Sequence, residues 1–216
     1  MIITYQGVQN FKVQFGDTVL AFDPVSKNSK HKASSFGADI ALVSLNHPDM
    51  NGIEQASRGE KEAFVIQGPG EYEVQGVFIK GLPSVSLYPS TGSGQVGGEE
   101  KTNTIYTVNL ENINLCFLGA LGDAKIPNVT KESIDGVDIL FVPIGGNGAL
   151  DASEAYKFAV SLEPSIIIPM NYSAESLKSF LKEGSAEGLK PLDKLTIKKK
   201  DLEGKEGEIV VLLPQA

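Results

Sequence analysis

One histidine and one aspartate stand two residues apart in the segment SLNHPDMNG, residues 44–52, which follows an apolar run. Imidazole and carboxylate groups bind transition metals and also serve as general acids and bases. His47 and Asp49 are therefore the first candidates for chemistry in this chain. Leu45 and Met50, in the same segment, are apolar side chains where a metal site would be expected to place polar ones.

The whole chain contains only two histidines and one cysteine. A catalytic zinc ion takes three protein ligands, and a bridged pair of metals about 3.5–4 Å apart needs more. The second histidine, His31, lies between lysines in the segment NSKHKAS, which predicts a solvated loop. The composition therefore predicts that a binuclear zinc centre is absent. A weak single-metal site would have to combine His47 and Asp49 with Asp123 or Asp151.

Other polar residues favour structural roles. Asp23, in the segment AFDP, is expected to orient a neighbouring loop. The segment IGGNGAL precedes a helix that begins near Asp151, and it favours a tight turn over an anion site at the helix N-terminus. Cys116 lies inside an apolar run and is expected to be a small core residue. The lysines at 198–200 predict an exposed or edge strand.

The hydrophobic pattern predicts the elements that position these residues. Short β-branched or aromatic runs indicate strands at 2–7, 11–15, 18–24, 40–45, 63–68, 71–82, 104–110, 113–121, 137–146 and 165–171, with a closing pair within 194–214. Helical spacing predicts helices at 151–164 and near 173–184. Residues 88–103 are rich in Gly and Ser and predict a mobile loop. This order predicts two packed β-sheets with helices outside, in one domain of residues 1–216.

Composition narrows the classes of function. The formal net charge of −8 argues against nucleic acid or an anionic membrane as the main partner. The N-terminus shows no signal-peptide pattern, and no apolar run approaches the length of a membrane span. A single cysteine excludes an intrachain disulfide, so a cytoplasmic location is expected. The sequence leaves open whether the partner is a small molecule, another protein or a second copy of the chain.

Position for position, the chain resembles the metallo-β-lactamase-fold hydrolases, most closely the small bacterial branch that includes the L-ascorbate-6-phosphate lactonase-like proteins. The resemblance rests, in order, on ITYQGVQNFKV, VLAFDP, ALVSLNHPDMNG, VIQGPGEYEVQGVFIKGLPS, TNTIYTV, INLCFLGALG, VDILFVPIGGNGALDASEA and PSIIIPMNY. It implies an α+β fold, a four-layer αββα sandwich. It also implies hydrolytic activity at two zinc ions held by loops at one edge of the sheets.

The same resemblance implies that most metal ligands of the family are missing here. The family signature His-x-His-x-Asp-His falls on residues 45–50, where only His47 and Asp49 remain. The changed positions are Leu45, Met50, Phe117 and about Ser86 for histidines, Ala120 for the bridging aspartate, and Asn171 for the last histidine. His47, Asp49 and Asn171 would then be remains of a former site. Zinc, the cofactor of the related family, is not expected in this chain.

Apolar residues at the changed positions predict that the former pocket is filled. Leu45, Met50, Phe117 and Ala120 are expected to pack together and to hold the loops without metal. Burying a Leu, Met or Phe side chain contributes roughly 1.5–3 kcal/mol.

Local structure explains the polar residues of this loop without catalysis. Asp49 is interpreted as the acceptor of an Asx-type turn with the backbone N–H groups of residues 50–52. Asn51 and Glu54 are interpreted as a cap for the helix that follows. His47 is interpreted as a hydrogen-bonded loop histidine.

Three functions are compatible with these features. We favour a metal-free, non-hydrolytic descendant of a hydrolase that acts by binding or assembly. The second possibility is a metal-dependent hydrolase with a reduced, rearranged site around His47 and Asp49. The third is a non-catalytic partner subunit of an intact paralogue. Metal analysis separates the second function from the other two.

Overall fold

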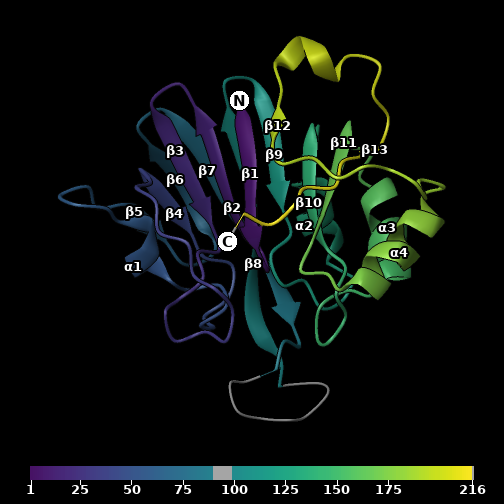
Figure 1. Ribbon diagram of the computed structural model, residues 1–216, viewed down its shortest axis with the longest axis horizontal. Coiled ribbons are helices and arrows are strands. Elements are labelled where there is room, and N and C mark those ends of the chain that lie inside the picture. The colour runs from purple at the N-terminus through teal and green to yellow at the C-terminus, as the bar shows by residue number, and fades with distance from the viewer. Residues whose placement is uncertain (90–98, 216) are drawn as a thin grey trace.

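Two stacked β-sheets form the centre of the molecule (Figure 1), and the computed structural model describes residues 1–89 and 99–215. The strands of the first sheet, in the spatial order β12-β1-β2-β3-β4-β5, are Leu195–Thr196, Ile2–Gly7, Asn10–Phe15, Thr18–Phe22, Ile40–Leu42 and Phe64–Ile66. Ile3, Tyr5, Phe11 and Val13 are buried and alternate with less buried residues along β1 and β2. This alternation is typical of strands with one face on a core.

The second sheet runs in the order β13-β11-β10-β9-β8-β7-β6. Its strands are Glu208–Ile209, Ile166–Met170, Ile139–Pro143, Ile113–Phe117, Lys101–Leu110, Val77–Ser86 and Gly70–Val74. Strands β6 to β9 pair in antiparallel fashion, whereas β10 pairs in parallel with β9 and β11. Every residue of β10 and β11 is buried, which explains their continuous apolar sequences.

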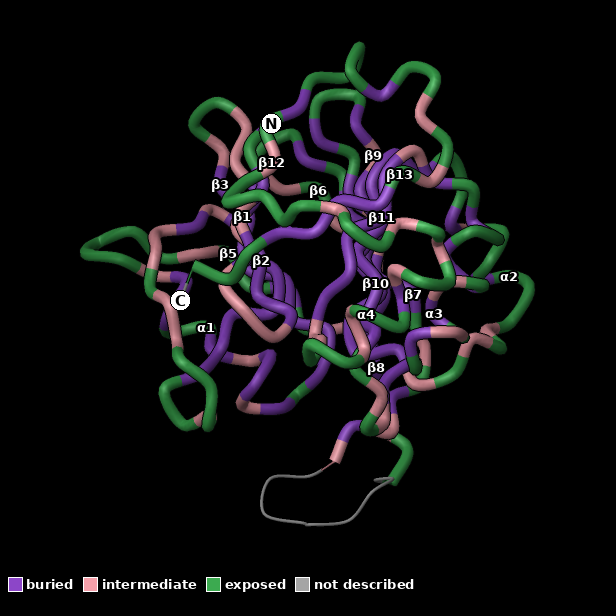
Figure 2. The backbone as a smooth tube through the Cα atoms, turned by 45° about the vertical axis from the view of Figure 1, so that its right-hand side comes forward, coloured by how far each residue is buried: buried purple, intermediate pink, exposed green. Residues whose placement is uncertain are grey.

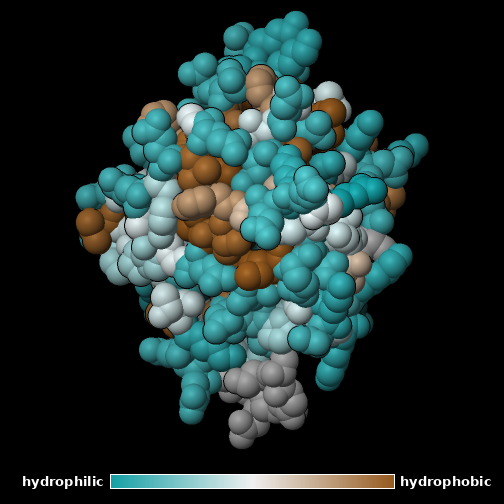
Figure 3. Space-filling view, turned by 90° about the vertical axis from the view of Figure 1, so that its left-hand side faces the viewer, coloured by the Kyte–Doolittle hydropathy of each residue, from teal (hydrophilic) through white to brown (hydrophobic). Residues whose placement is uncertain are grey.

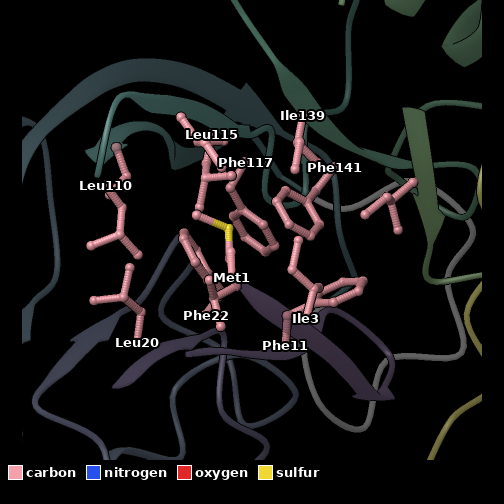
Figure 4. Close-up of a cluster of buried hydrophobic side chains, with 14 of the residues drawn as sticks. Met1, Ile3, Phe11, Leu20, Phe22, Leu110, Leu115, Phe117, Ile139 and Phe141 are labelled. Atoms are coloured by element: carbon pink, nitrogen blue, oxygen red, sulfur yellow. The ribbon is translucent and has the colours of Figure 1, made fainter. Parts of the chain in front are cut away.

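The main core lies between the two sheets. Phe11 and Phe22 of the first sheet meet Phe117 and Phe141 of the second, with ring centroids 4.8 Å apart for Phe11 and Phe141 (Figure 4). In Figure 2 the buried backbone follows the strands, while exposed backbone is concentrated in the turns and outer loops. This packing fixes the ends of the strands, from which the candidate site is built.

The helices lie outside the sheets, and they cover the second sheet more fully than the first. They are α1 (Ile53–Ala56), α2 (Asn128–Glu132), α3 (Ala152–Val160) and α4 (Ala174–Glu183). Side chains of α3 and α4 pack with residues of β10 and β11 in a second core on the outer face of the second sheet. On the first sheet, Ala56 of the short α1 packs against Ala21 and Ala41. The predicted sandwich is confirmed, with a thin outer layer on the first sheet.

Four predicted elements differ from the structure. The two strands of the closing pair predicted within 194–214 lie in different sheets, because β12 pairs with β1 and β13 pairs with β11. The single strand predicted at 71–82 is a hairpin, because Gln75 and Gly76 adopt positive φ angles of 52° and 78° between β6 and β7. The predicted loop 88–103 is shorter, because β8 begins at Lys101, and its residues 90–98 lie outside the described residues. The lysines at 198–200 are not a strand, since Lys199–Leu202 forms a 3₁₀ helix.

None of the helices in the described parts of the chain is long and apolar enough to cross a membrane. The edge strand β5 carries apolar side chains at the surface, and the face in Figure 3 shows an apolar area surrounded by hydrophilic residues. On β5, the exposed fractions of Phe64 and Val65 are 52% and 36%. β5 has only three residues, a length that limits pairing with another strand.

Candidate functional site

The loop after β4 is held in place by a buried carboxyl group. Asp23, fully buried after β3, accepts hydrogen bonds from the backbone N–H of Ser44 at 2.7 Å and from its hydroxyl at 2.6 Å. The carbonyl oxygen of Ser44 accepts a hydrogen bond from the backbone N–H of Thr104 at 2.9 Å. Gly119 also lies against Ser44, since a Cβ at Gly119 would come within 2.4 Å of the Ser44 Cβ. Asp23 therefore orients this loop, as its position in the sequence predicts.

His47 and Asp49 are both buried within this loop. The Nδ1 atom of His47 accepts the backbone N–H of Asp49 at 3.1 Å and lies 3.5 Å from the Asp49 Oδ2 atom. The carboxylate of Asp49 accepts the hydroxyl of Ser29 on Oδ1 at 2.5 Å and that of Tyr88 on Oδ2 at 3.0 Å. Both oxygen atoms of Asp49 are thus bound by protein donors.

His31 lies closer to this pair than the sequence indicates. Its Nε2 atom is 3.9 Å from the Oδ2 atom of Asp49, and its side chain is 53% exposed. The predicted exposure of His31 is confirmed, whereas its approach to Asp49 was missed. The lysine-flanked segment carries no periodicity that could have revealed this contact.

Tyr88 fills the space beside His47. It packs with Leu45, Met50 and Ala120 in a small buried cluster. Its ring meets the imidazole of His47 edge to face, with a centroid separation of 5.0 Å. The predicted packing of Leu45, Met50 and Ala120 is therefore confirmed, and an unpredicted tyrosine completes it.

Two contacts fix the backbone of Tyr88. Its N–H donates to the hydroxyl of Ser86 at 3.1 Å, and its carbonyl oxygen accepts from the Nζ atom of Lys101 at 2.7 Å. Burial raises the pKa of Tyr88, and the nearby Asp49 carboxylate adds to the effect, so the phenol stays protonated as a donor. The signal that could have found Tyr88 is a large aromatic residue two positions after Ser86, in a segment otherwise typical of a loop.

Phe117 does not join this cluster. It belongs to the main core, where its ring centroid lies 4.9 Å from that of Phe22 and 5.9 Å from that of Phe141 (Figure 4). The prediction that Phe117 packs with Leu45 is wrong because its side chain faces the first sheet from β9. The side chain of Phe117 therefore fills space in the main core and not in the former metal pocket.

Asn171 follows β11 in a left-handed conformation, with a φ of 52°. Its backbone N–H donates to the carbonyl oxygen of Val8 at 2.6 Å, and the Tyr5 hydroxyl lies 3.3 Å from the same nitrogen. Asparagine tolerates this conformation better than most residues. The contacts of Asn171 therefore hold the end of β11 against the turn between β1 and β2 of the other sheet.

Two further carboxylates are engaged in local turns. Asp123 is exposed, and its Oδ1 atom accepts the backbone N–H of Lys125 at 2.8 Å. Asp151 caps α3 by accepting the backbone N–H groups of Ser153 and Glu154, both at 2.9 Å. A carboxylate thus occupies the start of α3, which supports the predicted turn over an anion site.

The predicted Asx turn at Asp49 is wrong. The backbone N–H groups of Met50 and Asn51 both donate to the carbonyl oxygen of His47 at 2.8 Å. The carboxylate of Asp49 is directed instead to two hydroxyl groups from distant parts of the chain. Long-range partners have replaced the local ones that a sequence pattern can predict.

The predicted cap of α1 is also wrong. The N-cap residue is Gly52, without a side-chain hydrogen bond, and the helix has only four residues. Glu54 accepts hydrogen bonds from the hydroxyl of Ser26 and the backbone N–H of Lys27, both at 3.0 Å. Asn51 instead bonds to the amide side chains of Asn46 and Gln67.

The residues present do not fit a binuclear zinc centre. Within residues 1–89 and 99–215, no group of three or more His, Cys, Asp or Glu residues is arranged to hold a metal ion. Burial lowers the pKa of His47, partly opposed by the Asp49 carboxylate, so its imidazole stays neutral. The Nδ1 lone pair of that ring is already bound to an N–H group. The arrangement can bind and orient, but it offers no set of converging metal ligands.

Substitution of Tyr88 tests this packing. Tyr88→Phe removes a donor to a buried carboxylate and is expected to lower the free energy of unfolding by about 1–3 kcal/mol. Tyr88→Ala also leaves a cavity and is expected to lower it by about 3–5 kcal/mol. Urea unfolding of both variants measures the two effects. Tyr72→Phe, which removes a hydroxyl bound to backbone carbonyls near the surface, serves as control and should have a smaller effect. A neutral Tyr88→Phe would contradict the contact with Asp49.

The sequence of this chain is similar to those of known proteins. A family model described as the beta-lactamase superfamily domain matches residues 2–171. A UPF0173 metal-dependent hydrolase from Carboxydothermus hydrogenoformans is 29% identical over an alignment of 222 residues, covering 88% of this chain and 94% of the relative. Another from Pelotomaculum thermopropionicum is 24% identical, covering 80% of this chain and 85% of the relative.

Solved structures show the same architecture. A protein from Thermotoga maritima, assigned to the Zn-dependent hydrolases of the metallo-β-lactamase superfamily, has a TM-score of 0.75 and 26% identity, covering 98% of this chain and 97% of that one. The metallo hydrolase Igni18 from Ignicoccus hospitalis has a TM-score of 0.62 and 16% identity, covering 99% and 95% of the two chains, and it supports the fold alone. The family model spans most of the sequence, and the two stacked sheets match those of the Thermotoga maritima structure. The chain therefore belongs to the metallo-β-lactamase superfamily.

Proposed function

We propose that this protein is a metal-free member of the superfamily that acts by binding rather than by hydrolysis. The observation that supports the proposal is the buried cluster of Leu45, Met50, Tyr88 and Ala120, in which the tyrosine hydroxyl also binds Asp49. Three of these residues stand where the resemblance places metal ligands. A side-chain cluster in that place leaves no open coordination position for a reactive water.

The remaining polar groups also support a structural role. Hydrolysis by this family's chemistry needs a metal to lower the pKa of a bound water molecule. In this chain the Asp49 carboxylate accepts two hydroxyl groups, and the His47 imidazole accepts a backbone N–H. These groups hold the loop together, so neither is free to take a proton from water in the described arrangement.

The alternative function is a hydrolase with a reduced metal site. It is favoured by one observation, the approach of the exposed His31 to within 3.9 Å of Asp49. Displacement of Tyr88 would leave two imidazoles and one carboxylate near each other.

We also propose a cytoplasmic location, supported by the single, fully buried Cys116. A non-catalytic pairing with an intact paralogue is compatible with the binding role.

Metal analysis tests the proposal directly. The purified protein is expected to contain no stoichiometric zinc, iron or manganese, and its melting temperature is expected to be the same with and without chelator. A bound ion would stabilise the folded state by mass action and make the melting temperature depend on its concentration. The relative from Carboxydothermus hydrogenoformans, purified in parallel, serves as the comparison. One tightly held transition metal per chain, or a clear drop in the melting temperature on chelation, would favour the alternative function, a hydrolase with a reduced metal site.

A further inference from the structure

A separate cleft of about 270 Å³ lies beside the loop after β4. It is bounded by this loop, the connection from β5 to β6 and the start of β8. Its polar side chains are Ser44, Asn46, Asn51, Gln67, Thr102 and Thr104. All six are uncharged, although charged residues make up 21% of the chain. The lining therefore offers hydrogen bonds without a net charge.

Three of these side chains form a chain of amides. The Nε2 atom of Gln67 donates to the Oδ1 atom of Asn51 at 3.1 Å, and the Nδ2 atom of Asn51 donates to the Oδ1 atom of Asn46 at 2.8 Å. Each amide has two N–H donors and one carbonyl acceptor with two lone pairs. The two bonds therefore orient the three groups and still leave each of them able to bind a ligand.

Hydrogen bonds and close packing hold the backbone of the cleft walls. The Tyr72 hydroxyl lies 3.1 Å from the carbonyl oxygen of Gly68 and 3.3 Å from that of Pro69, and it fixes the connection from β5 to β6. A Cβ at Gly81 of β7 would come within 2.7 Å of the Gly68 carbonyl oxygen. Strand β7 therefore packs tightly against the connection from β5 to β6. On the opposite wall, Ser44 is held by Asp23. A site organised before binding loses less entropy when the ligand enters.

From this geometry we infer that the cleft binds a small, neutral, polyhydroxylated ligand of monosaccharide size. Hydroxyl groups both donate and accept, which matches a row of amides and threonine hydroxyls. Among the residues that the structure describes, the lining has no cation for a phosphate or carboxylate, and no carboxylate for an ammonium group. Its volume is below the roughly 300–1,000 Å³ of sites for drug-sized molecules. The inference gives the proposed binding role a site and a ligand class, and it rests on that role.

Nuclear magnetic resonance of the ¹⁵N-labelled protein tests the inference. The probes are glucose, galactose, mannose and N-acetylglucosamine, each at millimolar concentration, with glucose 6-phosphate, glucuronate and glucosamine as charged counterparts. At least one neutral sugar is expected to shift the side-chain amide signals of Asn46, Asn51 and Gln67. The charged counterparts are expected to bind more weakly.

Matched variants locate the binding. Asn51→Ala and Gln67→Ala each remove one amide from the row, and each is expected to weaken the sugar complex about tenfold or more. The control Asn109→Ala breaks a similar amide pair, in which Asn109 donates to Asn114 at 2.7 Å on β8 and β9, and should leave affinity unchanged.

Three results would overturn the inference: no neutral sugar moves these signals, the charged sugars bind equally well, or the control weakens binding as much as the cleft variants. Metal content, measured on the same sample, separates this failure from failure of the proposed metal-free role.

Discussion

A variant with the family's ligands restored is expected to unfold at a much lower urea concentration than the parent when chelator is present. The five substitutions are Leu45→His, Met50→His, Phe117→His, Ala120→Asp and Asn171→His. Each buried polar group without a partner costs on the order of 1–3 kcal/mol. Their sum approaches the 5–15 kcal/mol that stabilise a typical domain, so the combined variant is expected to lose most of its stability without metal.

The single substitutions should differ in a defined order. Phe117→His is expected to be the most damaging, because it leaves unfilled volume among three other aromatic rings in the main core. Leu45→His should cost less, since it faces the smaller cluster around Tyr88. Asn171→His should be mildest, because the residue is partly exposed and histidine tolerates its positive φ.

Zinc is expected to rescue the combined variant only when Tyr88 is also changed. The tyrosine side chain packs against Leu45, Met50 and Ala120, three of the restored positions, and its hydroxyl binds Asp49. Adding Tyr88→Ala opens that space, so zinc should then raise the unfolding midpoint by mass action. The measurement is urea unfolding of both variants with chelator and with zinc. Rescue without the change at Tyr88, or a neutral single variant at Leu45, would show that the pocket is open.

The sequence predicts those parts of the fold that depend on local pattern. The continuous apolar runs of β10 and β11 predict buried strands, and Asp151 predicts the start of α3 through its side-chain cap. The apolar spacing near 173–184 predicts α4, and the structure shows Ser173 as its capping residue. These features depend on residues within one or two turns of the chain, so no knowledge of the tertiary structure is needed.

The contents of the candidate site depend on longer distances. Asp49 is bound by hydroxyls 20 and 39 residues away, and neither Ser29 nor Tyr88 belongs to a motif. The side of the sheet on which Phe117 lies follows from the register of β9, which a short apolar run leaves undetermined. The sequence therefore predicts that ligands are missing, but not which side chain takes their place.

The stability of the wild-type protein relative to Asp23→Asn is expected to fall as the pH rises. Burial raises the pKa of Asp23 from 3.8 to about 8, and the hydrogen bonds from Ser44 only partly oppose this. Between these two values the folded state holds one proton that the unfolded chain has released. The free energy of unfolding therefore decreases with pH, by up to about 1.4 kcal/mol per pH unit. The stability that protonated Asp23 contributes is fully present below the pKa of the unfolded chain. It is lost as the pH rises through the pKa of Asp23 in the folded state.

Asparagine provides the matched comparison because it has the same shape and cannot ionise. Its Oδ1 atom can accept the Ser44 N–H, and its Nδ2 group can donate to the Ser44 hydroxyl, so both contacts are retained in altered form. The measurement is urea unfolding of both proteins between about pH 5 and pH 9, where shared titrating groups cancel in the difference. The wild type should lose several kcal/mol relative to the variant across this range. A flat difference would mean that Asp23 is ionised in the fold and held as a carboxylate by its two donors, which would make it a charged anchor for the loop after β4.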